Sequence, residues 1–306
     1  MSGANPNSTD CTGVVHYLKT AARDVERALD QLLPLPRLAP ERELYFAMRY
    51  SLFAGGKRLR PALFFAALEA FGRERTPFLP FAAALEMIHT YSLIHDDLPA
   101  MDDDDLRRGQ PTCHVRYGEA LAILAGDALL THAFALMLQP MAGAAPADQM
   151  AAAREVAWQA GIGGMVAGQA AEIVSLQSEV DEGLLTYIYQ GKTSALFAAA
   201  VVSAAHLCGA AQEEIAALRE YAKHLGLGFQ IIDDVLDVEG DTAKLGKPVG
   251  SDEARELTTF VTLYGCEAAR QRAAQEAEAA RCSLDIFGGS AAMLRQFPAL
   301  LAERDH

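Results

Sequence analysis

The sequence is poor in cysteine and in positive charge, and no segment alternates polar and apolar residues as a strand does. Its five cysteines are an odd number without a CxxC pair, which favours reduced thiols over a disulfide framework. The 26 lysines and arginines are outnumbered by 40 acidic residues, for a formal net charge of -14. Binding to phosphate backbones requires the opposite excess, so we expect no nucleic-acid partner.

Neither a targeting signal nor a membrane span is predicted. The first 13 residues contain no basic segment and no apolar run, so we expect no secretory signal and a cytoplasmic location. One uncharged stretch, Thr193 to Ala211, is long enough to raise the question of a span. Alanine is its commonest residue and Ser203 and His206 interrupt it, whereas leucine, isoleucine and phenylalanine dominate membrane spans. We therefore predict a buried core helix there.

Helical periodicity runs through the chain. Alanine and leucine are abundant, and apolar residues recur at intervals of three and four along most segments. Glycine and proline mark breaks at Pro34-Leu35-Pro36, Gly55-Gly56, Gly161 to Gly164 and from about Gly240 to Glu256. A chain of 306 residues can bury one large core. This punctuation predicts an all-α single domain, residues 1–306, of about ten helices, with residues 1–10 flexible.

A dense acidic cluster follows the apolar segment Phe81 to Ile94. Asp96, Asp97 and the run Asp102 to Asp105 place six carboxylates within ten residues. Their mutual repulsion is tolerated only if cations bind or the segment is disordered. Because the helix before the cluster is strongly apolar, we expect order and therefore cations. A solvated acidic turn is the alternative for this cluster taken alone.

A second acidic cluster consists of Gln230, Asp233, Asp234 and Asp237. Their spacing of i, i+3, i+4 and i+7 places them on one helix face, and apolar residues fill the other faces. Such a helix is buried, and buried carboxylates need metal or cationic partners. Oxygen ligands without histidine or cysteine suit Mg²⁺, which completes its coordination with water and substrate phosphate. Two such clusters favour a phosphate-ester substrate over two solvated turns.

Local basic groups fit a second phosphate group. Lys57, Arg58 and Arg60 follow the Gly55-Gly56 break, and Arg107 and Arg108 directly follow the acidic run. Arginine forks and lysine charges suit a diphosphate that metal does not fully coordinate. A basic surface turn is the alternative interpretation.

Three further features are ambiguous by themselves. The tetrapeptide from Gln190 to Thr193 interrupts an apolar helix and contains Lys192, which either binds phosphate or extends to solvent along a helix irregularity. His89 lies two helical turns before Asp96 on roughly the same face, where a buried core histidine is the commoner finding. Gln169 is similarly ambiguous.

These motifs, in this order, resemble those of the trans-isoprenyl diphosphate synthases, and among them the bacterial farnesyl diphosphate synthases. The resemblance extends from about Leu44 to the C-terminus. It implies a helical bundle around a central cavity, a homodimer, and three Mg²⁺ ions per active site. It further implies that the metal ligands are Asp96, Asp97, Asp102, Asp233 and Asp237, with Asp234 and Lys192 as additional catalytic residues.

The same resemblance assigns the substrate contacts. Those for isopentenyl diphosphate are Lys57, Arg60, His89 and Arg108. Those for the allylic diphosphate are Arg107, Lys192, Thr193 and Gln230. One position departs from the family pattern, because a Lys-x-Thr-Tyr sequence is common where this chain has Leu257-Thr258-Thr259-Phe260. We expect weaker allylic binding there, or compensation from Lys247 or Lys244.

The implied reaction is head-to-tail condensation of isopentenyl diphosphate with dimethylallyl or geranyl diphosphate, with release of pyrophosphate. Tyr91 lies five residues before Asp96, roughly 7.5 Å along the helix. A ring at that depth would stop the tail at about three isoprene units, and Ser92 beside it is small. Farnesyl diphosphate is therefore the expected product, and geranylgeranyl diphosphate is the alternative if the tail bypasses the ring.

Two other functions use similar residues. A terpene cyclase also ionises a diphosphate with Mg²⁺ on a helical scaffold, but its second metal site usually has an Asn/Ser/Glu pattern, and it would have no use for an isopentenyl pocket. An inert subunit of a heteromeric synthase is a non-enzymatic alternative, in which Leu257 marks lost activity. Nearly all metal and substrate positions are filled in this chain, which argues against it.

Overall fold

The structure is a computed structural model that describes residues 12–35, 41–239 and 257–302. Its first part contains α1 (Thr12–Leu32), α2 (Arg42–Leu52), α3 (Leu59–Ala70), the 3-10 turn η1 (Thr76–Phe78), α4 (Leu79–Asp96), α5 (Cys113–Tyr117) and α6 (Glu119–Met137). Its second part contains α7 (Pro146–Ala160), α8 (Met165–Ser175), α9 (Glu182–Tyr189), the π-helix η2 (Gln190–Ser194), α10 (Ala195–Leu207), α11 (Gln212–Glu239), α14 (Phe260–Ser283), η3 (Asp285–Ala291), η4 (Leu294–Gln296) and α15 (Ala299–Ala302). The all-α prediction is confirmed, and the expectation for residues 1–10 concerns a segment outside the described residues.

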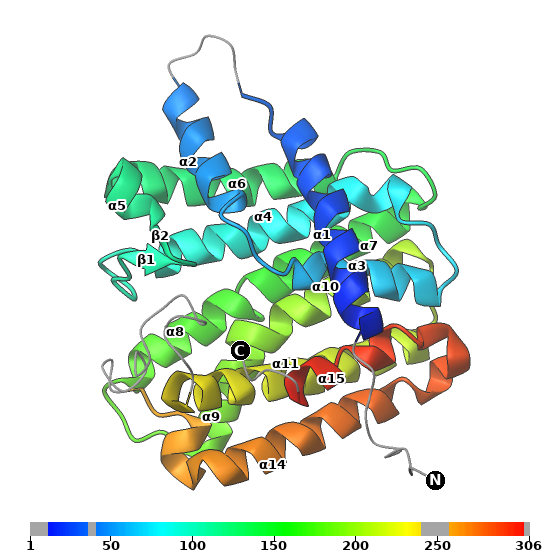
Figure 1. Cartoon of the computed structure of the whole chain (residues 1–306). Coiled ribbons are helices and arrows are strands. Elements are labelled where there is room, and N and C mark those ends of the chain that lie inside the picture. The colour runs from blue at the N-terminus through cyan, green and yellow to red at the C-terminus, as the bar shows by residue number, and fades with distance from the viewer. Residues whose placement is uncertain (1–11, 36–40, 240–256, 303–306) are drawn as a thin grey trace, which may run out of the picture.

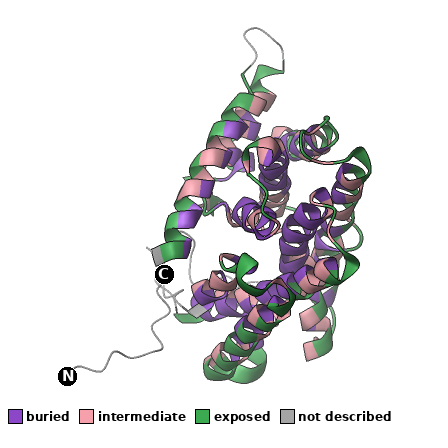
Figure 2. Cartoon of the chain, turned by 90° about the vertical axis from the view of Figure 1, so that its right-hand side faces the viewer, coloured by how far each residue is buried: buried purple, intermediate pink, exposed green. Residues whose placement is uncertain are grey.

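The helices form a bundle in which α4, α10 and α11 are the central members (Figure 1). α10 packs against α3, α7 and α11, and α11 packs against α14. α1 and α2 lie on one side of the bundle and α14 lies on the other. Figure 2 shows that buried residues gather on the helix faces turned toward the middle of the bundle, while exposed residues lie on the outward faces.

α4 is the helix that positions the first acidic cluster. It is apolar around most of its circumference, so other helices must surround it, and α1, α2, α3, α6 and α10 do so. Pro80 lies in the first turn, where its missing N–H breaks no helical hydrogen bond. Phe81 stacks on Phe64 of α3 with ring centroids 5.3 Å apart. Because α4 is packed on several sides, its last residue, Asp96, is held in place.

A short hairpin is the one exception to helical structure among the described elements. Strands β1 (Leu106–Arg107) and β2 (Gln110–Pro111) pair antiparallel. The turn between them has positive φ at Arg108 (54°) and Gly109 (74°), as tight hairpin turns require. No alternating segment in the sequence indicates these strands, because a two-residue strand is too short to show such a pattern.

The two most apolar helices differ in burial. The stretch that raised the question of a membrane span forms α10, where every residue except His206 is buried, so the core-helix prediction is confirmed. Among the described residues, α6 alone is long and apolar enough to cross a membrane by length and composition, with a mean hydropathy of 1.7. Only 39% of that apolar window is buried, and Ile123 and Leu124 are among its exposed side chains.

Glycines bring α8 and the π-helix η2 into backbone contact. A Cβ atom on Gly168 would lie 2.4 Å from the backbone nitrogen of Lys192 and 2.7 Å from the carbonyl carbon of Gly191. A Cβ atom on Gly191 would in turn lie 2.8 Å from the Cα atom of Gly168. π-Helical turns inside α-helices often occur at functional sites. The glycine contact therefore fixes where the backbone of Lys192 lies.

Gly168→Ala should destabilise the fold. The added methyl group meets backbone atoms, which cannot move aside as a side-chain end can, so we expect a loss of about 1–3 kcal/mol in the free energy of unfolding. Urea denaturation followed by circular dichroism measures this. Gly289→Ala is the matched control, since a Cβ atom there meets nothing within 4 Å. Equal stability of the two variants would contradict the contact.

Candidate active site

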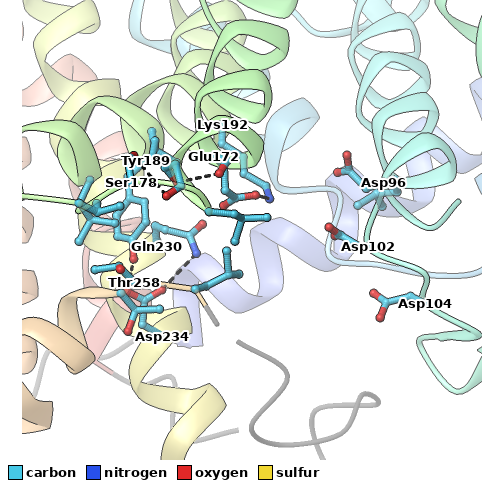
Figure 3. Close-up of a pocket in the computed structure, with 18 of the residues that line it drawn as sticks. Asp96, Asp102, Asp104, Glu172, Ser178, Tyr189, Lys192, Gln230, Asp234 and Thr258 are labelled. Carbon is cyan, nitrogen blue, oxygen red and sulfur yellow. Dashed lines mark hydrogen bonds and ion pairs between the residues drawn. The ribbon is translucent and has the colours of Figure 1, made fainter. Parts of the chain in front are cut away.

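Two adjoining cavities lie where α4, α8, η2 and α11 meet. The smaller one, of about 310 Å³, is lined largely by charged and polar side chains (Figure 3), and we call it the polar cavity. The larger one, of about 850 Å³, is predominantly apolar, and we call it the apolar cavity. Both are lined by Leu93, Asp96, Arg107, Lys192 and Gln230. A molecule with a charged head and an apolar tail could therefore occupy both.

The first acidic cluster forms one wall of the polar cavity. The backbone N–H of Asp102 donates to the carbonyl oxygen of Asp96 at 2.8 Å, which folds the loop back on the end of α4. As a result Asp96, Asp102 and Asp104 line the same wall (Figure 3). Asp97 is buried and accepts a hydrogen bond from the Nε atom of Arg107 at 2.6 Å. The predicted ligands Asp96 and Asp102 are thus brought together, while Asp97 binds Arg107.

The opposite wall contains an ion pair between Lys192 on η2 and Glu172 on α8. Figure 3 shows the two side chains pointing toward one another, across the cavity from the aspartates of the first cluster. Glu172 was not among the site residues predicted from the sequence. Its signal was the spacing from Gln169, because an acid three residues further on a helix shares its face. Both residues do line this pair of cavities.

The second acidic cluster divides between the two cavities. Asp233 lines the apolar cavity, and Asp234 lines the polar one. Asp234 is buried and accepts hydrogen bonds from the Tyr189 hydroxyl at 2.5 Å and from the Phe260 N–H at 3.2 Å. Asp237 is also buried and is not among the residues that line these two cavities. Of the three predicted carboxylates, Asp233 and Asp234 therefore face the site directly.

A chain of hydrogen bonds connects η2 to α11. The Thr193 hydroxyl donates to the Oε1 atom of Gln230 at 2.8 Å, and the Nε2 atom of Gln230 donates to Asp234 at 3.3 Å. Thr193 and Gln230 were both predicted as substrate contacts. The bonds set the orientation of the Gln230 amide between the cavities.

Burial and neighbouring charges shift the proton affinities at this site. Burial, together with Asp102 and Glu172, raises the pKa of Asp96 to about 7, although Lys192 and Arg107 oppose the shift. Burial would lower the pKa of Lys192, but Glu172, Asp96 and Asp102 outweigh it and raise that pKa. An additional cation near Asp96 would relieve the repulsion among these carboxylates.

The donor set fits Mg²⁺ bound jointly with a phosphate. No group of three or more acidic, histidine or cysteine side chains among the described residues is close enough to hold an ion alone. Asp96, Asp102, Asp104 and Glu172 nevertheless line a single cavity. Mg²⁺ usually takes one or two carboxylates and completes its shell with water and substrate phosphates. Separated carboxylates across a polar cavity suit that coordination.

The mouth of the apolar cavity is basic. Arg60, His89 and Arg108 line it, as predicted for a second diphosphate. Arg108 donates to the carbonyl oxygen of Gly55, and a Cβ atom on Gly56 would lie 2.7 Å from its guanidinium group. The glycine break therefore makes room for Arg108.

A buried ion pair holds this basic turn on the bundle. Arg58, with a φ of 49°, donates to Glu86 on α4 at 2.9 Å and to the carbonyl oxygen of Leu52 at 2.6 Å. Arg58 and Glu86 are each about 2% exposed. Arg58 thereby fixes the turn between the exposed Lys57 and the cavity-lining Arg60.

His89 has the properties of a neutral hydrogen-bonding group. Burial lowers its pKa well below the usual value, and Arg60, Arg108 and the other nearby arginines add to the shift. Its Nδ1 atom and the Nε atom of Arg60 are buried without a partner among the described residues. Buried polar groups without partners are rare in native proteins, so these two atoms indicate where a polar ligand fits.

Tyr91 and Ser92 both line the apolar cavity. Burial raises the pKa of Tyr91 to about 12, with a contribution from Asp96, so the phenol stays neutral. The chain-length residues predicted from sequence thus face the space that a tail would occupy.

Leu257, the residue that differs from the family pattern, lies at the polar cavity. Leu257, Thr258 and Thr259 line it, so an apolar side chain lies where a lysine is common in the family. The residues expected to compensate, Lys244 and Lys247, lie outside the described residues.

Comparison with known proteins gives concordant matches. The family model described as polyprenyl synthetase matches residues 41–283. A farnesyl diphosphate synthase of Geobacillus stearothermophilus is 44% identical over 96% of this chain and 98% of that protein. A chloroplastic geranylgeranyl pyrophosphate synthase of Capsicum annuum is 42% identical over 95% of this chain and 78% of that protein. An apo crystal structure of an FPP/GFPP synthase from Zymomonas mobilis has a TM-score of 0.85 at 36% identity, over 95% of this chain and 99% of that one.

The raised pKa of Asp96 predicts a pH-dependent affinity for Mg²⁺. Asp96 must lose its proton to bind the ion, so the affinity should fall up to about tenfold per pH unit below pH 7 and level off above it. Calorimetric Mg²⁺ titrations at about pH 6, 7 and 8 measure this dependence. Asp96→Asn removes the titrating group and should flatten the profile. A slope that persists in Asp96→Asn would assign the proton to another residue.

Proposed function

Because this chain belongs to the polyprenyl synthetase family, we propose that it condenses isopentenyl diphosphate with dimethylallyl and geranyl diphosphates to farnesyl diphosphate, releasing pyrophosphate. The single observation that carries the proposal is the pairing of the two cavities. A charged cavity lined by carboxylates adjoins an apolar cavity with a basic mouth. Two diphosphates and one hydrocarbon tail need that arrangement.

The allylic substrate places its diphosphate in the polar cavity. Lys192 and Arg107 each line both cavities, so their charges can reach oxygens of the departing pyrophosphate. Charge-assisted hydrogen bonds of this kind are the strong ones. In the resting structure Glu172 and Asp97 hold the two cations, and binding would redirect them toward the diphosphate. They stabilise the negative charge that develops as the carbon–oxygen bond breaks.

Mg²⁺ is the implied cofactor, and we propose three ions per site. Asp96 and Asp102 on one wall and Asp233 on α11 are the leading ligands, with Asp97 and Asp237 as the further members of the two clusters. When bound, Mg²⁺ supplies Lewis-acid stabilisation of the leaving pyrophosphate. Glu172 lines the same cavity and adds to its negative charge.

Isopentenyl diphosphate occupies the basic mouth of the apolar cavity. Arg60 and Arg108 supply charge there, and neutral His89 supplies a hydrogen bond from its ring. Holding the double bond next to the allylic carbocation converts a bimolecular encounter into an oriented attack. The new carbon–carbon bond forms head to tail, and proton loss to the departing pyrophosphate restores a double bond. No side-chain nucleophile is needed.

The apolar cavity accommodates the growing tail. Tyr91 lies one helical turn and a little more before Asp96 on α4, and Ser92 beside it adds little bulk. The tail therefore meets the phenol ring at the depth of a farnesyl chain. The Leu257 side chain in the polar cavity predicts weaker binding of the allylic diphosphate than a lysine would give.

A homodimer is part of the proposal. α6 exposes Ile123 and Leu124, and α8 exposes Val166 and Ile173. Ile123, Val166 and Ile173 line the same cavity, so the two exposed faces are neighbours. An apolar face of this kind is covered by a partner in most proteins, and a second copy of the chain fits it. The four described cysteines form no disulfide, which suits a cytoplasmic location.

Asp96→Ala and Asp233→Ala should each abolish most turnover while leaving the helical fold intact. We expect a loss of at least about 100-fold in kcat, because each variant removes stabilisation of the developing charge. The assay incubates purified protein with isopentenyl diphosphate, dimethylallyl diphosphate and Mg²⁺ and extracts the products. Asp285→Ala is the control, since Asp285 is exposed and far along the chain in η3. A wild-type protein without any prenyl product would support the inert-subunit alternative.

Leu124→Glu should shift the protein toward the monomer. A charge at the centre of an apolar interface is costly to bury, so sedimentation should report about half the mass of the wild type. Ile286→Glu is the matched control, because Ile286 is a similarly exposed apolar residue on η3. An unchanged mass for Leu124→Glu would place the interface elsewhere.

A further inference from the structure

We propose that His95 and Gly126 together set the depth of the apolar cavity and so act as specificity-determining residues for product length. The proposal rests on the function proposed above. It adds to Tyr91 a second group of residues, which packs beside the phenol ring and has a contribution from a different helix. A single imidazole ring packs between α4 and α6 at this point.

The His95 ring lies between Tyr91 and α6. Its centroid is 5.7 Å from that of Tyr91, and the two ring planes meet edge to face at 82°. Its Nε2 atom lies 3.1 Å from the carbonyl oxygen of Ile123 on α6. Because a carbonyl oxygen can only accept, Nε2 carries the hydrogen. The Asp127 carboxylate, 4.0 Å from the same atom, also favours that arrangement. The ring is therefore held against α6.

Gly126 is what makes room for this ring. A Cβ atom on Gly126 would lie 2.1 Å from Nε2, 2.5 Å from Cδ2 and 2.9 Å from Cε1 of His95. Glycine inside a helix costs about 1 kcal/mol relative to alanine, and Gly126 has no positive φ that would require it. The close approach of the imidazole is therefore the physical reason for glycine at this position in α6.

The ring is also part of the cavity wall. His95, Tyr91 and Ile123 all line the apolar cavity, so a shift of the imidazole changes the space open to the tail. A methyl group on Gly126 displaces the ring away from α6, and because the ring lines the cavity we expect less space for the tail. Removal of the imidazole leaves a gap beside Tyr91, into which the phenol ring can move. The two changes should therefore alter product length in opposite directions.

The test compares product distributions of full-length variants supplied with isopentenyl diphosphate, dimethylallyl diphosphate and Mg²⁺. Gly126→Ala should raise the ratio of geranyl to farnesyl product about tenfold, and His95→Ala should raise the ratio of geranylgeranyl to farnesyl product about tenfold. In the double variant, Gly126→Ala has no ring to displace, so the products should match those of His95→Ala. Thr131→Ala, an exposed change on the same helix, should leave the wild-type distribution.

The rate of the first condensation separates specificity from a purely structural role. A structural role would lower that rate or the stability and leave the product ratios unchanged. His95→Asn provides a second variant, polar but smaller than the imidazole, and it should also lengthen the products. Unchanged ratios in His95→Ala, His95→Asn and Gly126→Ala, with a wild type that makes farnesyl diphosphate, overturn this proposal alone. So does equal shortening by Gly126→Ala with and without the imidazole. A wild type that makes no prenyl product overturns the proposed function and this inference together.

Discussion

Repulsion among partly buried carboxylates is the constraint on which this structure depends. Asp96, Asp102, Asp104 and Glu172 line one small cavity, and burial raises the pKa of Asp96 to about 7. Among the residues that the structure describes, Lys192 and Arg107 are the two cations that line this cavity. The helices around the cavity must therefore be held by packing elsewhere, because the site itself opposes the compact state. The same accumulation of negative charge supports the proposed binding of divalent cations together with a diphosphate.

The supporting contacts are made by small residues or by buried ion pairs. Gly168 and Gly191 let α8 touch η2, so that the Lys192 side chain starts from a fixed backbone. Arg58 and Glu86 perform the same task for the basic turn, since a buried pair that loses one partner leaves an uncompensated charge. The glycine contact and the buried ion pair lie outside the two cavities, yet they determine where the phosphate-binding side chains point. Packing between the helices thus orients the side chains that bind the two substrates.

Diphosphate binding and control of product length involve different residues of the same helix, α4. The last residue of α4, Asp96, faces the polar cavity, whereas Tyr91 one turn earlier faces the apolar one. Asp96 also lines the apolar cavity and contributes to the raised pKa of Tyr91, so the two regions adjoin on this helix. The walls of the apolar cavity come from α4, α6, α8 and α11, so its shape depends on how those helices pack.

The sequence by itself determined the helices and the kind of reaction. Periodicity indicated the helices and the buried α10, and the spacing of Asp96, Asp102 and Asp233 with their resemblance to a known family indicated the reaction. The strands of the hairpin were missed because two residues are too few to show alternation, and Glu172 was missed because its one signal was a spacing of three residues from Gln169, which was itself ambiguous. Only the tertiary structure decided that Asp233 and Asp234 face different cavities and that His95 needs a glycine on α6. Those facts depend on which helices become neighbours, and contacts between residues far apart in the chain leave no periodic signal in either segment.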